Sequence, residues 1–140
     1  SLWPPYFFIK MQEVTMENTI FNHDTHLRFY FRMLRRSGDR KNPATRALFY
    51  VLGIGKETRN HIDELFDWRR KQVRPEALHA HWQTDQSMRT TLTAFHLWDG
   101  HTNRAYAHLL APHALLSGIF GPLYAEALKL RFPQLFESTE

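Results

Sequence analysis

Nine histidines make imidazole the most obvious source of chemistry in this sequence. Neutral imidazole is a common ligand for transition metals, and His79 and His81 stand only two positions apart. On a helix, side chains at that spacing point about 200° apart, so they would not share one ion. The remaining candidates considered are His96, His101, His108 and His113. We therefore predict scattered surface and capping histidines, no metal site and no cofactor.

Three carboxylates gather in one short stretch, at Asp63, Glu64 and Asp67. Asp63 and Asp67 are one helical turn apart, so on a helix they share a face. General acid–base chemistry would require burial to separate their pKa values. Because Arg59 lies one turn before Asp63, an exposed face of ion pairs explains the same pattern. We favour that interpretation over a catalytic pair.

Arginines provide the strongest electrostatic pattern. They recur at about one-turn spacing on the first predicted helix, and two further cations follow in the next loop: Arg28, Arg32, Arg35, Arg36, Arg40 and Lys41. Such a basic strip could contact nucleic-acid phosphates or another anionic partner, and that binding would weaken with salt. The second and third predicted helices also have the outline of a helix-turn-helix, but acidic residues on the third would repel phosphates.

Several classes of chemistry are missing from the sequence. It contains no cysteine, which excludes disulfides, zinc–thiolate sites and thiol nucleophiles. Residues 53–55 read Gly-Ile-Gly, but no predicted strand precedes them, so they do not form a dinucleotide-binding loop. No phosphate-binding loop or nucleophile elbow is present either. The absence of these residues and motifs favours a binding protein over an enzyme.

The elements that would position these residues are predicted to be helices. A chain of 140 residues with 43% hydrophobic residues is long enough to build one core without a disulfide or metal. Helical periodicity and capping residues predict helices over residues 22–37, 44–52, 56–67, 76–81, 85–99, 103–110 and 122–131. No strand pattern is seen after residue 21. We expect an all-α fold, a single compact bundle of about five to seven short helices.

The first 21 residues differ from the helical domain expected over residues 22–140. Aromatic residues cluster here, including Trp3, Tyr6, Phe7 and Phe8. A tail or short strand lying on the domain is the simpler interpretation, and a leader is another. The alternative is a hydrophobic arm that contacts a partner or a second copy of the chain. No apolar run is long enough to span a bilayer, so we expect no membrane association and a cytoplasmic location.

Short motifs in a fixed order resemble a small bacterial family of unknown function. They occupy residues 47–53, 58–63, 75–78, 82–84, 94–100 and 124–133, within a resemblance that covers about residues 21–136. The resemblance implies a protein of phages or mobile elements, chiefly of Firmicutes. It implies no activity and no catalytic residues. The matching polar positions are a candidate shared site or a structural hydrogen-bond network: Arg59, His61, Asp63, Trp82, Gln83 and Thr84.

Three hypotheses for function follow. The first is a non-enzymatic accessory factor that binds another protein, for instance as an inhibitor of a host nuclease or defence system of the anti-CRISPR type. The second is a nucleic-acid-binding protein that uses the basic strip of residues 28–41. The third is an enzyme or small-ligand binder that uses His61, Asp63 and Trp82.

Overall fold

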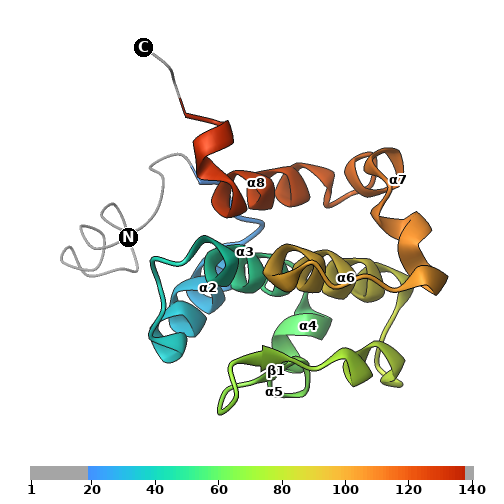
Figure 1. Ribbon diagram of the computed structural model, residues 1–140, viewed down its shortest axis with the longest axis horizontal. Helices are drawn as coiled ribbons and strands as arrows, with labels where there is room; N and C mark the ends of the chain where they lie inside the picture. The colour runs from blue at the N-terminus through green and yellow to red at the C-terminus, as the bar shows by residue number, and fades with distance from the viewer. Residues whose placement is uncertain (1–18, 138–140) are drawn as a thin grey trace.

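One helix that is apolar on nearly every side organises this fold. The computed structural model describes residues 19–137 (Figure 1). Along the chain, its elements are α2 (Asp24–Ser37), α3 (Pro43–Leu52), α4 (Lys56–Asn60), α5 (Ile62–Leu65), β1 (Phe66–Asp67), β2 (Gln72–Val73), the 3₁₀ helix η1 (Pro75–His79), α6 (Asp85–Asp99), the 3₁₀ helix η2 (Arg104–Leu110), α7 (Pro112–Leu116), α8 (Gly121–Arg131) and the 3₁₀ helix η3 (Pro133–Leu135). The predicted all-α class is confirmed, with one very small sheet added.

The central helix is α3. Its last six residues, from Ala47 to Leu52, are completely buried. A helix that is hydrophobic all round must be covered on every side. Helices α2, α6 and α8 pack around α3 and provide that cover. The core of the molecule therefore lies along α3 (Figure 1).

Four predicted helix ends are confirmed at the capping residues that mark them, whereas the N-cap of α2 is His23, which makes no side-chain capping bond. The Asn42 side chain accepts hydrogen bonds at the start of α3, and Thr84 and Ser87 form a reciprocal capping box on α6. Helices α2 and α6 end at Gly38 and Gly100, whose φ angles of 70° and 80° favour glycine. Capping residues thus mark the end of α2, the start of α3 and both ends of α6.

The third predicted helix, over residues 56–67, is wrong in its second half. The backbone leaves the helical region at His61 (φ −119°, ψ 28°), and a short α5 follows. Phe66 is extended, which buries its ring, and the chain then forms a hairpin in which Phe66 pairs with Val73. The expectation of no strand after residue 21 is corrected here. Strands of two residues are too short to show an alternating pattern.

The last third of the domain also differs from the prediction. The helices expected over residues 76–81 and 103–110 are 3₁₀ helices, and α7 was not predicted. Ala111 is extended (φ −60°, ψ 137°) because Pro112 follows it, so the chain bends and begins a new turn there. Helix α8 begins at Gly121, one residue before the predicted start.

Of the predicted N-terminal arm, the structure describes residues 19–21. The hydroxyl of Tyr50 donates to the carbonyl of Ile20 at 2.6 Å, and the ring of Phe21 lies 5.5 Å from that of Tyr50. The amide of Ile20 donates to the buried carboxylate of Glu126 at 3.2 Å. These contacts attach the chain to α3 and α8 before α2 begins. Trp3, Tyr6, Phe7 and Phe8 lie outside the described residues.

Candidate partner-binding cleft

A cleft lined mainly by apolar side chains opens between α6, α8 and the η2–α7 segment. Its volume is about 430 Å³, within the range of ligand-binding pockets in proteins. In Figure 1, α8 lies above α6, and η2 and α7 connect them at the right-hand end of the view. The lining residues are Leu92, Thr93, His96, Leu97, Thr102, Asn103, Tyr106, Ala107, Leu110, Ala111, Pro112, Leu115, Leu116, Tyr124 and Leu128.

The two walls of the cleft are helix faces that also serve the core. Leu92 and Leu97 of α6 are almost fully buried, and Tyr124 of α8 is 1% exposed. The Tyr124 hydroxyl is hydrogen-bonded to Thr90 at 2.8 Å and accepts from Gln86 at 3.1 Å. Burial raises the pKa of this phenol, so it stays protonated. These wall residues are therefore closely packed, and the Tyr124 phenol is neutral.

The segment that closes one end of the cleft is packed much less deeply. Neither η2 nor α7 contains a buried residue. Leu116, which lines the cleft, is 41% exposed, and Ile119 in the following turn is 81% exposed. Side chains of this size are normally found inside a fold, and apolar surface grouped with a cleft is typical of an interaction site. The apolar lining thus continues onto the outer surface.

Four of the polar side chains that line the cleft already make contacts within the chain: Thr93, His96, Asn103 and Tyr124. Nδ1 of His96 lies 3.0 Å from the carbonyl of His101, and Thr93 donates to the carbonyl of Arg89 at 2.8 Å. The Asn103 side chain accepts from Ala105 at the start of η2. Among the described residues that line the cleft, none forms a pair of nucleophile and base. This arrangement can hold an apolar group, and it offers no catalytic constellation.

The predicted polar site divides into separate environments. The His61 ring stacks on Trp82 at 4.1 Å, and Nδ1 of His61 lies 2.7 Å from the carbonyl of Glu57. The indole N–H of Trp82 donates to Glu64 at 2.5 Å. His61, Trp82 and Glu64 thus hold α5 against the loop before α6.

Asp63 faces a different group of residues. It lies 3.1 Å from the guanidinium of Arg36 and accepts from the indole N–H of Trp68 at 2.8 Å. The guanidinium of Arg36 also stands 4.0 Å above the Trp68 ring. Asp63 therefore ties α2 to the hairpin and makes none of these contacts with His61.

Gln83 and Thr84 serve the start of α6. Gln83 bridges Ser87, at 2.6 Å, and Thr91, at 3.2 Å, while Thr84 caps the helix. Arg59 acts at the other end of the group, where its guanidinium donates to the carbonyl of Gly53 at 2.8 Å. Burial lowers the pKa of Arg59, and the nearby Glu57 partly offsets this effect. The contacts of Thr84, Ser87 and Arg59 stabilise helix ends, and the bond of Gln83 to Thr91 holds the preceding loop on α6.

The basic strip lies on the exposed face of α2 and in the loop that follows. All six of its residues are exposed: Arg28, Arg32, Arg35, Arg36, Arg40 and Lys41. Arg28 lies 3.3 Å from Asp24, one turn earlier, in an exposed ion pair worth little to stability. The structure adds a neighbour that the sequence did not indicate. Nζ of Lys71, in the β1–β2 loop, donates to the carbonyl of Ser37 at 2.7 Å.

One histidine belongs to the core. His26 is fully buried, with Nδ1 accepting from the amide of Asn22 at 2.9 Å and Nε2 lying 2.7 Å from the carbonyl of Tyr50. Desolvation by burial lowers its pKa to about 4. His26 is therefore neutral and donates to Tyr50. Within residues 19–137, no three histidine or acidic side chains are grouped to hold a metal ion.

The cleft itself was missed in the sequence. Its walls belong to predicted helices, but the η2–α7 segment was expected to be one helix and a loop. A signal was available, since residues 105–116 carry many apolar side chains on elements too short to bury them, interrupted by Pro112.

Within the described residues, no helix has the length and apolar character needed to cross a bilayer.

The fold and the site define a small helical domain with an open apolar cleft. The chain belongs to a family of unknown function, DUF6075, whose profile matches residues 16–140. This confirms the predicted resemblance to a family without an assigned activity. Neither a curated protein nor a solved structure matches the chain. The link to bacteria, phages and mobile elements stays a prediction.

Proposed function

We propose that this chain is a non-enzymatic binding protein that holds an apolar segment of another protein in the α6–α8 cleft. The observation that carries the proposal is that Leu116, which lines the cleft, is 41% exposed, and that Ile119, three residues further along the chain, is 81% exposed. A small molecule inside the cleft would leave Ile119 in water. A helix or extended segment lying along the cleft would cover both side chains, as in known modes of peptide recognition.

The chemistry of the lining supports binding over catalysis. The hydroxyls of Thr93 and Tyr124, the imidazole of His96 and the amide of Asn103 are engaged in contacts within the chain. The alternative of an enzyme or small-ligand binder at His61, Asp63 and Trp82 gains no support from the geometry, because His61 and Asp63 contact different partners. Those contacts are sufficient to explain the polar residues shared by the family-like motifs as structural.

The finer parts of the proposal depend on the resemblance. We include in it a role as a phage or mobile-element accessory factor in the cytoplasm, with a host nuclease or defence protein as the partner to be inhibited. Dimerisation through Trp3, Tyr6, Phe7 and Phe8 is a further part. It is tested by the mass in solution of the full chain and of a variant with these four aromatics replaced by serine.

The experiment compares affinity capture from host cells by the wild-type chain and by two variants with single added charges. Leu116→Glu places a carboxylate at the cleft, whereas Leu135→Glu changes a leucine that is 72% exposed and does not line it. We expect one protein to be retained by the wild type and by Leu135→Glu and lost with Leu116→Glu. The purified partner should then show the same order of Kd by calorimetry.

Two outcomes would contradict the proposal. Capture of the same proteins by both variants would mean that the cleft is not the binding site. A bound apolar small molecule, detected by native mass spectrometry of the purified chain and lost with Leu116→Glu, would identify a ligand carrier instead. Thermal unfolding of both variants checks that each is folded, since both residues are at the surface.

A further inference from the structure

Two basic segments that are far apart in the sequence meet at one corner of the molecule. The first is the C-terminal half of α2 with the loop after it, residues 32–41, and the second is the β1–β2 hairpin, residues 66–73. Lys71 donates to the carbonyl of Ser37 at 2.7 Å, and the Arg36 guanidinium lies 4.0 Å above the Trp68 ring. We refer to these two ranges together as the basic corner.

Charge is concentrated at the basic corner. Its eight cations are all exposed: Arg32, Arg35, Arg36, Arg40, Lys41, Arg69, Arg70 and Lys71. Only two carboxylates, Asp39 and Asp67, belong to the same ranges, so the corner has a formal charge of +6. The whole chain has +4, with 18 basic and 14 acidic residues, which leaves −2 for the rest. Asp63 offsets part of this charge at Arg36.

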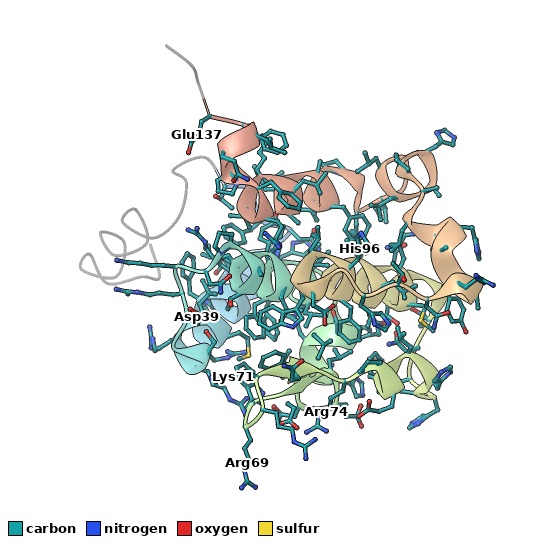
Figure 2. All side chains as sticks on the ribbon, in the orientation of Figure 1. Asp39, Arg69, Lys71, Arg74, His96 and Glu137 are labelled. Atoms are coloured by element: carbon teal, nitrogen blue, oxygen red, sulfur yellow. The ribbon has the colours of Figure 1, made fainter. Side chains whose placement is uncertain are left out.

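The hairpin tip is built to present its cations. The Asp67 carboxylate accepts from the backbone amides of Arg69 and Arg70, both at 3.0 Å, which folds the turn without using either guanidinium. Lys71 has a φ of 56°, an unusual conformation for a residue other than glycine. Its bond to Ser37 holds this turn against α2. Figure 2 shows the Arg69 side chain pointing away from the body of the molecule.

We propose that the basic corner binds the phosphate backbone of a nucleic acid. The inference is independent of the cleft, because it uses α2 and the hairpin in place of α6 and α8. It also goes beyond the strip predicted from the sequence, since three of its eight cations come from the hairpin. Six of its eight cations are arginines, whose planar forks match phosphate oxygens in two-point contacts.

The composition of the corner separates this partner from a membrane surface. Peripheral membrane proteins combine cations with exposed large apolar side chains that enter the lipid. The large apolar side chains exposed in the described part of the chain are Ile20, Leu116, Ile119, Leu135 and Phe136, all outside the corner. Its cations are also spread along the end of α2, the loop after it and a hairpin, which suits a string of phosphates.

The test measures binding of the full chain to a fluorescein-labelled 30-base-pair DNA duplex, and to RNA and single-stranded DNA of the same length, by anisotropy between 50 and 300 mM KCl. With about four phosphates contacted, log K should fall with log salt with a slope of about −3.6. The variant Arg69→Glu/Arg70→Glu should weaken binding at least tenfold at 50 mM KCl. It should also reduce the slope by about two, because two contacts are lost.

The matched control is Lys56→Glu/Arg104→Glu. It removes the same charge at exposed positions on α4 and η2, outside the corner. We expect it to bind within about threefold of the wild type. If both double variants weakened binding equally, binding would depend on the net charge of the chain and not on the basic corner, and the proposal would be overturned. The absence of binding to all three nucleic acids at 50 mM KCl would also overturn it. Binding only to phosphatidylserine vesicles, lost with Arg69→Glu/Arg70→Glu, would overturn it in favour of a membrane.

Discussion

Acid should destabilise this protein through one buried histidine. His26 has a pKa of about 4 in the folded chain and an ordinary value of 6.5 when exposed. Burial is the main cause, and the nearby Arg59 and His23 add to it. The unfolded chain therefore binds the proton more tightly. The stability that the neutral ring provides is fully present above pH 6.5 and is lost progressively as the pH falls towards 4.

The size of the effect follows from the difference between the two pKa values. At about 1.4 kcal/mol per pKa unit, the difference between 6.5 and about 4 corresponds to roughly 3 to 4 kcal/mol. Most of this should be lost by pH 4, which is a large part of the 5–15 kcal/mol typical of a domain. Protonation of Nδ1 would also remove the acceptor for Asn22, at 2.9 Å. The energetic loss and the structural change thus occur together.

Urea unfolding at pH 7.5 and pH 4 tests this prediction in the wild type and in His26→Gln. Glutamine does not titrate in this range and can still donate to Tyr50. We expect His26→Gln to be less stable at pH 7.5, but to lose about 3 kcal/mol less than the wild type between the two pH values. The other histidines contribute equally to both proteins. Equal losses in both, or a His26 ring that titrates near 6.5 by NMR in the folded chain, would refute the reasoning.

Two further predictions concern the stability of the fold, one at two glycines and one at the N-cap of α6. A Cβ at Gly53 would lie 2.7 Å from Phe29 and 2.9 Å from His26, so Gly53→Ala should cost about 2 kcal/mol or more of unfolding free energy. Gly100→Ala meets open space but has a φ of 80°, so about 1 kcal/mol is expected, and equal costs for the two would contradict this view. Thr84→Ala should cost about 1 kcal/mol by removing the capping box of α6, whereas Thr84→Ser should stay within about 0.5 kcal/mol. Urea unfolding measures all four variants.

Helix ends were predictable because their causes are local. Asn42, Thr84, Gly38 and Gly100 act within a few residues of their own positions, and the structure uses each as the sequence suggests. The break at His61 has a longer-range cause. Its ring stacks on Trp82, 21 positions further along the chain, and Phe66 turns inward to reach Phe49. Tertiary packing of this kind overrides local helical preference.

The candidate sites show the same distinction. The basic strip of residues 28–41 could be found from its spacing in one stretch of sequence. Its neighbour Lys71 could not, because the hydrogen bond between Lys71 and Ser37 spans 34 positions. The six polar residues of the family-like motifs contact different partners in the fold and serve separate structural tasks. The cleft depends on how far η2 and α7 stand from α6 and α8, and no local pattern encodes that distance.

The cleft and the basic corner are made by different helices, and this separation has a functional consequence. The cleft uses α6, α8 and the segment between them, whereas the corner uses α2 and the hairpin. Both sets of elements meet at α3, which is buried and closely packed. The residues that line the proposed cleft include none from the basic corner, so we expect that a protein segment and a nucleic acid can be held at once. If the two sites do not interact, saturating one should leave the Kd of the other unchanged. Leu116→Glu should then weaken only protein binding, and Arg69→Glu/Arg70→Glu should weaken only nucleic-acid binding.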